Sequence, residues 1–138
     1  MATPSPNTES PLPAEAVYDA IGPAYQDAYA GVADKLAASI LDIGCGTGVP
    51  VCRLLADAGH DVLGIDISAA MLAAARERVP HANAHFEKCD IRDFDRPDGS
   101  FDAASAYFSL IMGLSQEEIR GAWRKVFGLL KGAGCLCL

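Results

Sequence analysis

The sequence predicts an α/β fold in which parallel strands alternate with helices, and three observations support this. Short apolar segments recur along the chain, and turn and helix-capping residues separate them. A strand expected over Ser39–Ile43 runs directly into a glycine-rich turn at residues 44–48 and a helix start at Pro50. The length of 138 residues suits a single domain. Strands joined through helices should be parallel, with right-handed crossovers.

The N-terminal part divides into a tail and the start of the domain. Residues 1–13 are rich in Pro, Ser, Thr and Asn, so we expect a disordered tail there and a domain over residues 14–138. Between residues 14 and 38, apolar and aromatic side chains recur every three or four positions, which predicts a helix. Gly22-Pro23 should break this helix into two pieces.

The later elements follow from capping and helix-breaking residues. Ser68 and Ser115 are N-cap residues just before two predicted helices. Gly59 ends the helix predicted over residues 50–58, and Pro80 ends the helix predicted over residues 69–79. In chain order we expect a helix over 50–58, a strand over 60–65, a helix over 69–79, strands over 84–89 and 101–107, a helix over 116–130, a turn over 131–134 and a fifth strand over 135–138.

Composition excludes several classes of function. A net charge of -7 and a pI near 4.7 disfavour nucleic acid as a partner and suit a small or neutral substrate. No apolar run approaches the ~18 residues of a membrane span, and the N-terminus lacks a signal-peptide pattern, which predicts a cytoplasmic protein. The five cysteines lack metal-binding spacing, so we expect reduced thiols and no metal site.

The glycine-rich turn predicts a site for a nucleotide-like ligand. Glycine permits the tight backbone angles and close approach that such a ligand needs, and free N–H groups at the following helix point toward it. The dinucleotide pattern G-x-G-x-x-G would need glycine at position 49, which is Val49; the third glycine is Gly48. Cys45 in this turn is either a small residue that fits or a reactive thiol, and we favour the first explanation.

Aspartates at the ends of the second and third predicted strands extend this site, since ligands of such sheets bind at the carboxyl ends of the strands. Asp66 lies about 20 residues after the glycine turn and can accept hydrogen bonds from both hydroxyls of a ribose. Helix capping is the alternative role for Asp66, but Ser68 already provides it.

Asp90 can accept a hydrogen bond from an adenine amino group, with a backbone contact from Ile91 or Cys89; a plain turn role is the alternative for Asp90. Met71 lies one helical turn past Ile67 and can cover the face of an adenine, or it can be an ordinary core methionine.

Several stretches resemble the class I S-adenosylmethionine-dependent methyltransferases that act on small molecules. Residues 42–48 resemble their motif I, D-x-G-x-G-x-G, and residues 66–71 resemble their D-x-S-x-x-M stretch. Residues 97–102 resemble the D-G-S-F-D lead-in to the fourth strand, and residues 129–134 resemble the L-L-K-P-G-G turn, with Gly132-Ala133 replacing Pro-Gly. The match keeps its order over residues 15–138. It implies a three-layer Rossmann-like sheet in the strand order 3-2-1-4-5 and S-adenosylmethionine as the cofactor.

The same resemblance implies roles for further residues. The methionine end of the cofactor would be held by motif I and the end of the fourth strand, that is by Asp42, Gly44, Cys45, Gly46 and Ala106. Tyr18 and Tyr25 would reach the cofactor carboxylate and the substrate side, with core packing as the alternative. Tyr107 and Ser109 would touch the methyl acceptor, with loop packing as the alternative.

Methyl transfer from a sulfonium is an in-line displacement in which the protein aligns the reactants and excludes water. A general base is optional, and His60, His81 and His85 are all expected near the amino ends of strands, opposite the crevice. We therefore assign no catalytic residue.

Complete members of this family have a seven-stranded sheet with an antiparallel C-terminal hairpin. Because the sequence stops at Leu138, we expect this hairpin to be missing, through truncation, a shortened gene product or completion by a partner. The open edge of the fifth strand would then favour a homo-oligomer. The leading hypothesis is a small-molecule O-, N- or C-methyltransferase. The alternatives are a non-catalytic S-adenosylmethionine-binding module or partner-dependent subunit, and a nicotinamide oxidoreductase, which Val49 disfavours.

Overall fold

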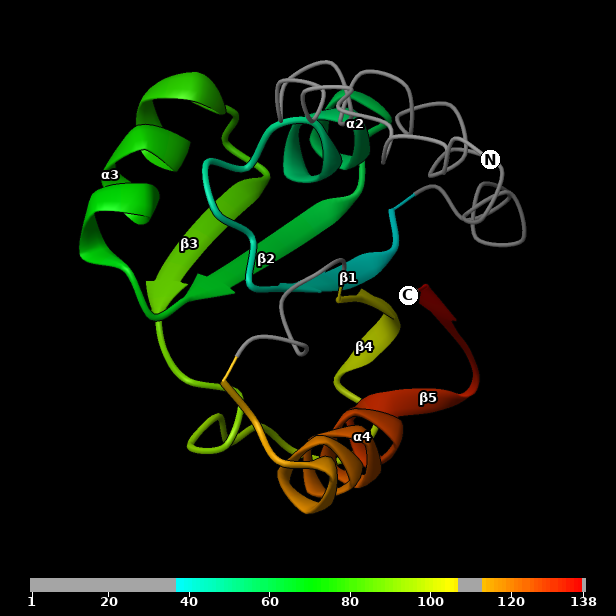
Figure 1. Ribbon diagram of the computed structural model, residues 1–138. Helices are drawn as coiled ribbons and strands as arrows, with labels where there is room; N and C mark the ends of the chain where they lie inside the picture. Colours follow the sequence, from blue (N-terminus) through cyan, green and yellow to red (C-terminus); the bar gives the residue numbers. More distant parts are fainter. Residues whose placement is uncertain (1–36, 107–112, 138) are drawn as a thin grey trace, which may run out of the picture.

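The computed structural model describes residues 37–106 and 113–137 and contains eight elements in this part of the chain (Figure 1). In chain order they are β1 (Ser39–Ile43), α2 (Val51–Asp57), β2 (Asp61–Asp66), α3 (Ala69–Arg78), β3 (Ala84–Lys88), β4 (Phe101–Ser105), α4 (Gln116–Leu129) and β5 (Leu130–Cys137). The predicted tail, most of the predicted N-terminal helix, and Tyr18, Tyr25, Tyr107 and Ser109 lie outside the described residues.

The five strands form one sheet in the order β3-β2-β1-β4-β5, and every neighbouring pair is parallel. Helices α2 and α3 lie on one face of the sheet and α4 lies on the other (Figure 1). This arrangement confirms the expected three-layer, Rossmann-like architecture and strand order. None of the helices in the described ranges has the length and apolar character needed to cross a membrane.

The two longest helices start where the sequence predicts. The Ser68 hydroxyl accepts a hydrogen bond from the backbone N–H of Met71 at the start of α3 (3.3 Å). Ser115 and Glu118 form a capping box on α4, since each side chain accepts a hydrogen bond from the backbone N–H of the other residue. Helix α2 begins at Val51, one residue later than predicted, with Pro50 at its N-cap position.

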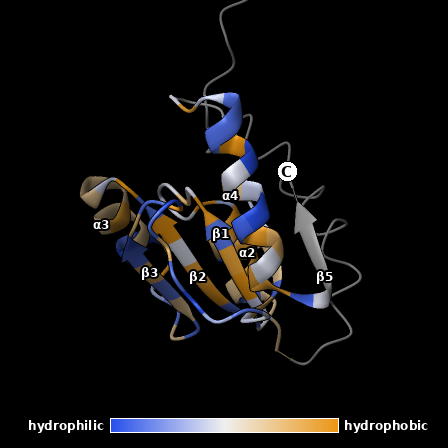
Figure 2. Ribbon diagram, turned by 90° about the horizontal axis from the view of Figure 1, so that it is seen from below, coloured by the Kyte–Doolittle hydropathy of each residue, from blue (hydrophilic) through white to orange (hydrophobic). Residues whose placement is uncertain are grey.

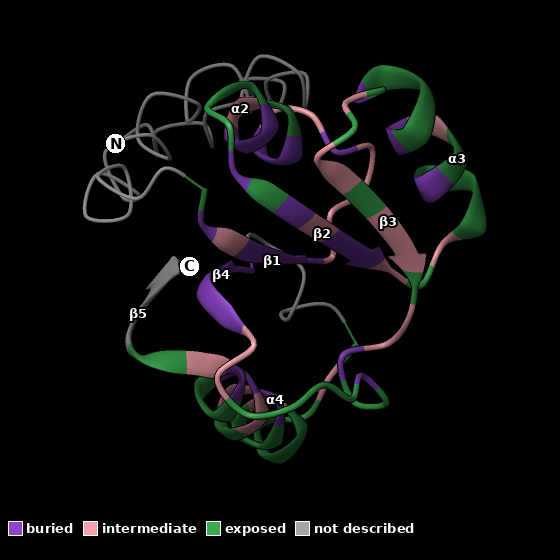
Figure 3. Ribbon diagram, turned by 180° about the vertical axis from the view of Figure 1, so that it is seen from behind, coloured by how far each residue is buried: buried purple, intermediate pink, exposed green. Residues whose placement is uncertain are grey.

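The sheet has an apolar core on each face, because successive side chains of a strand point to opposite sides. Ile40 of β1 packs on the α2 face with Val51, Cys52 and Leu55, and the neighbouring Leu41 packs on the α4 face with Ala122, Val126 and Leu129. Figure 2 shows hydrophobic residues along β1 and β2, as expected for strands covered on both faces. Figure 3 shows β1 and β4 largely buried and the edge strand β3 more open.

The predicted turn at residues 131–134 is wrong, because these residues lie within β5. Phe101 of β4 is paired with Leu130, whereas Ala103, two residues further on, is paired with Cys135. The extra residues of β5 therefore form an irregularity inside a continuing strand. The glycines at positions 132 and 134 favour such a departure from regular pairing.

Candidate functional site

The fold brings the predicted ligand residues to one edge of the sheet. The direction in which strands are added reverses between β1 and β4, and in open α/β sheets the ligand crevice lies at the carboxyl ends of the strands at this point. The glycine turn follows β1, and Asp66 ends β2, which runs beside β1 with Ile43 paired to Ile65. Asp90 follows β3, whose Lys88 pairs with Asp66. The buried Ala106 follows β4.

The backbone of the glycine turn favours glycine at all three positions. Gly44, Gly46 and Gly48 have φ angles of 68°, 57° and 72°, in the left-handed region that other residues rarely adopt. A Cβ added to Gly48 would also lie 3.1 Å from Val79 and 3.3 Å from Phe86. The turn then leads into α2, where the N–H of Arg53 donates to the carbonyl of Gly48 (3.0 Å).

Asp66 joins the glycine turn to the start of α3. Its Oδ2 accepts a hydrogen bond from the N–H of Gly46 (2.9 Å), and its Oδ1 accepts one from the N–H of Ser68 (2.8 Å). Ser68, not Asp66, is the N-cap residue of α3. Each carboxylate oxygen can accept a further hydrogen bond, and the residue is only partly buried. The predicted acceptor for a ribose is thus held against the glycine turn.

Asp42 lies in the interior and already has two protein partners. Its Oδ1 accepts a hydrogen bond from the Ser105 hydroxyl (2.6 Å), and its Oδ2 accepts one from the Cys52 thiol (3.3 Å). Burial raises the pKa of Asp42 to about 6, against the lowering effect of these two hydrogen bonds; repulsion from Asp66 adds to the rise. Asp42 is therefore bonded within the protein interior, and the sequence pattern did not predict these two partners.

Cys45 fills a gap between the glycine turn and β2. Its N–H donates to the carbonyl of Ile65 (3.0 Å), and its side chain packs over Gly64, where an added Cβ would lie 2.8 Å from the Cys45 sulfur. This packing supports the role of a small fitting residue. The pKa of the neighbouring Cys52 thiol is raised well above its usual value by its hydrogen bond to Cys45 and by burial, which disfavours the thiolate form.

Two large apolar side chains beside Asp66 face solvent. Ile67 is 69% exposed and Met71 is 46% exposed, so Met71 is not an ordinary core methionine. Ile91, in contrast, is 5% exposed and packs in the core on the α4 face. Its side chain is therefore not available to a ligand, and the backbone contact expected from the sequence stays a prediction.

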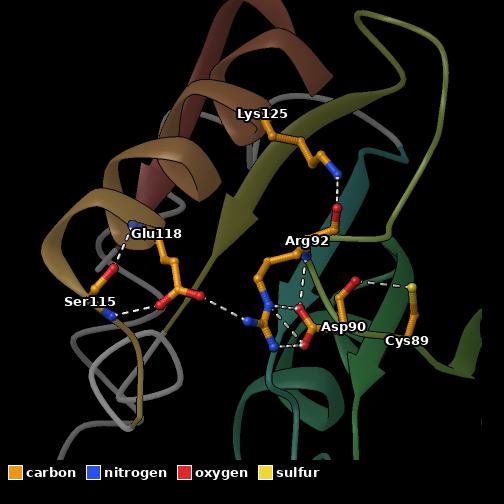
Figure 4. Close-up of polar contacts among 6 residues, drawn as sticks. All are labelled: Cys89, Asp90, Arg92, Ser115, Glu118 and Lys125. Atoms are coloured by element: carbon orange, nitrogen blue, oxygen red, sulfur yellow. Dashed lines mark hydrogen bonds and ion pairs between the residues drawn. The ribbon is translucent and has the colours of Figure 1, made fainter.

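Asp90 has a partner that sequence reasoning missed. The Arg92 side chain donates from Nε to both Asp90 oxygens (3.0 and 3.1 Å) and from Nη2 to Oδ2 (2.7 Å), as Figure 4 shows. The backbone N–H of Arg92 donates to Asp90 Oδ1 (2.9 Å). These bonds lower the pKa of Asp90 and keep it ionised. The Asp-x-Arg spacing was the available signal.

The three histidines lie away from this edge, as expected. His60 precedes β2 and accepts a hydrogen bond from the N–H of Ala38 at Nδ1 (3.2 Å); His81 precedes β3 and pairs with Asp57. His85 is the second residue of β3. No histidine is placed to act as a base at the carboxyl ends of the strands. Within the described ranges, no group of three His, Cys, Asp or Glu side chains is arranged to hold a metal ion.

A parallel sheet with a glycine turn at its switch point and carboxylates at the next two strand ends defines a Rossmann-like domain built for a nucleotide-like cofactor. Residues 40–134 match the model of the methyltransferase domain family, and the chain belongs to this family.

Named relatives agree with this assignment. The chain is 45% identical over 87 residues to the dTDP-3-amino-3,6-dideoxy-alpha-D-glucopyranose N,N-dimethyltransferase of Streptomyces fradiae, covering 62% of this chain and 32% of that protein. A crystal structure of an S-adenosylmethionine-dependent methyltransferase from Mesorhizobium loti is 28% identical, with a TM-score of 0.69, covering 86% of this chain and 53% of that one.

The structure of the [4+2]-cyclase SpnF is 31% identical to this chain, with a TM-score of 0.72, covering 86% of this chain and 44% of that one. The chain thus spans about a third to a half of the length of these proteins.

Proposed function

We propose that this chain binds S-adenosylmethionine and forms the cofactor-binding part of a cytoplasmic methyltransferase that acts on an O, N or C atom of a small molecule. The observation that carries the proposal is the hydrogen bond between Asp66 and the N–H of Gly46. It holds an acceptor for ribose hydroxyls beside a turn that suits the methionine end of the cofactor. The family match and the cofactor in the Mesorhizobium loti protein's name support the same ligand.

The roles follow the order of the strand ends. Asp66 would accept from the ribose, and Asp90 and the backbone of Ile91 would meet the adenine, whose faces Ile67 and Met71 could cover. The turn at Gly44, Cys45 and Gly46, together with Ala106, would hold the methionine end, with Asp42 beneath it. Tyr18 and Tyr25, and Tyr107 and Ser109 on the acceptor side, remain sequence predictions.

Methyl transfer from a sulfonium needs little acid–base catalysis. The sulfonium carbon is already activated, so the acceptor atom attacks it in line while the neutral thioether leaves, and the protein contributes alignment and exclusion of water. A net charge of -7 supports a small-molecule acceptor rather than nucleic acid. The Streptomyces fradiae relative, named for an amino-sugar nucleotide, supports the same class.

Calorimetric titration with S-adenosylhomocysteine, S-adenosylmethionine and NAD tests the cofactor. We expect both sulfur ligands to bind and NAD not to bind; binding of NAD alone would contradict the proposal. A panel of phenols, amines and carboxylic acids, with S-adenosylhomocysteine formation followed by mass spectrometry, tests the reaction.

A second candidate is a protein that binds the cofactor without transferring its methyl group. The likeness to a structure named as a cyclase supports this candidate, because it shows that the same fold occurs in a protein named for a reaction other than methyl transfer. Tight binding of both sulfur ligands, with no S-adenosylhomocysteine formed from any member of the panel, would favour it over the methyltransferase.

A further inference from the structure

Asp90 presents a nearly saturated carboxylate at the carboxyl end of β3. Three N–H groups of one residue, the backbone N–H, Nε and Nη2 of Arg92, donate to its two oxygens at 2.7–3.1 Å. A carboxylate has about four acceptor positions. Nε is shared between the two oxygens, so the three donors fill about three of these positions and leave about one free.

Arg92 is in turn held by helix α4. Its Nη1 donates to Glu118 Oε1 (3.1 Å), while Glu118 Oε2 accepts the Ser115 N–H of the capping box (2.8 Å). Lys125, two helical turns further along, donates from Nζ to the backbone carbonyl of Arg92. Figure 4 shows Arg92 between Asp90 on one side and the capped start of α4 on the other. The side chain and the backbone of Arg92 are thus both anchored to one helix.

We propose that Arg92 is a positioning residue for the adenine of the cofactor, because it orients Asp90 so that its one remaining acceptor position takes the adenine amino group. This inference rests on the proposed function. A neutral amino group needs only one acceptor, so the single acceptor position left on Asp90 is sufficient for it. The planar fork of arginine gives this orientation, whereas the ammonium of lysine would supply charge without it.

The contribution of Arg92 should come from orientation. Without the Arg92 side chain, only the backbone N–H of residue 92 still donates to Asp90, so the carboxylate can turn about this single contact, and binding must then order it. Exposed ion pairs contribute little to folding, and the Arg92 side chain is 50% exposed, so the loss of Arg92 should leave the fold intact.

Arg96 provides a matched control in the same loop. Its Nη2 lies 2.7 Å from Glu87 Oε2, the same distance as that between Arg92 Nη2 and Asp90 Oδ2, and its side chain is also partly exposed. Arg96→Ala therefore removes an equal charge and a similar ion pair without touching Asp90; it also removes the contact of the Arg96 guanidinium with the Phe94 ring (4.8 Å). Chemical denaturation of each variant checks the fold.

The experiment titrates wild type, Arg92→Ala, Arg92→Lys and Arg96→Ala with two ligands. One is S-adenosylhomocysteine, and the other is its 6-deamino analogue, in which hydrogen replaces the adenine amino group. We expect both Arg92 variants to bind S-adenosylhomocysteine about threefold to tenfold more weakly, the range of one net hydrogen bond. Their affinity for the analogue should stay within about twofold of wild type, and Arg96→Ala should match wild type with both ligands.

The two ligands separate positioning from a merely structural role. Unchanged or tighter binding of S-adenosylhomocysteine by Arg92→Ala, or an equal loss with both ligands, would overturn the inference while leaving the proposed function in place. Wild-type affinity in Arg92→Lys would also overturn it, because charge alone would then suffice. If the wild type binds neither ligand, the proposed function itself fails, and this inference fails with it.

Discussion

Replacing Asp42 with asparagine should remove a pH-dependent part of the protein's stability. Burial raises the folded-state pKa of Asp42 from 3.8 to about 6. Because the folded-state pKa is the higher one, the protonated carboxyl is favoured in the folded protein. Its contribution is fully present below about pH 3.8 and is lost as the pH rises through about 6. The full difference corresponds to roughly 3 kcal/mol.

Urea denaturation of wild type and Asp42→Asn at about pH 5 and about pH 7.5 measures this difference. From these pKa values, the free energy of unfolding of the wild type should fall by about 1 to 2 kcal/mol more than that of the variant as the pH rises between the two conditions. Asparagine retains an acceptor for the Ser105 hydroxyl, so its hydrogen-bonding cost should be nearly independent of pH. Asp61→Asn, at an exposed position, controls for removing one carboxylate. A wild-type-minus-variant difference that is equal at both pH values would refute the reasoning.

Three other changes give further tests. Asp66→Ala should weaken S-adenosylhomocysteine at least about tenfold in calorimetry, the effect of losing ~1.5–3 kcal/mol of charged hydrogen bonding; unchanged affinity would exclude Asp66 from the ribose role. Gly64→Ala would place a Cβ 2.8 Å from the Cys45 sulfur and should lower the free energy of unfolding by ~1–3 kcal/mol; a wild-type urea midpoint would contradict this. Ser115→Ala removes one bond of the capping box with Glu118 and should cost ~1 kcal/mol by thermal denaturation, and an unchanged Tm would count against the box.

Local patterns predicted the elements whose determinants lie within a few residues. The caps at Ser68 and Ser115 are confirmed because the hydroxyl and the N–H that it accepts from are three positions apart. The turn expected at residues 131–134 is wrong because these residues form an irregularity inside β5, between its pairs with β4 at Leu130 and Cys135. This tertiary constraint on both sides overrides the local glycine signal. Strand propensity is generally decided by such neighbours more than by the residues themselves.

The site was only partly predictable for the same reason. The positions of Asp66 and Asp90 at strand ends identified them as candidate residues, and the family resemblance added Asp42. Neither signal could identify their partners across the fold, since Ser105 lies 63 positions from Asp42, and Glu118 lies 26 positions from Arg92. Which side chains meet at such distances depends on strand order and register, which the sequence specified only through the resemblance.

The glycine turn is fixed before any ligand arrives, and this bears on its affinity. Three backbone N–H groups in the turn are already bonded: that of Cys45 to the carbonyl of Ile65, that of Gly46 to Asp66, and that of Gly48 to the carbonyl of Cys45. A loop that must be ordered on binding loses affinity, whereas a pre-organised one does not. Gly46 differs from the other two because its N–H donates to a side-chain carboxylate, and the ribose would bind the same carboxylate. The N–H of Gly46 and the ribose hydroxyls would then donate to one carboxylate, so changes at Asp66 should affect the turn and the ribose together.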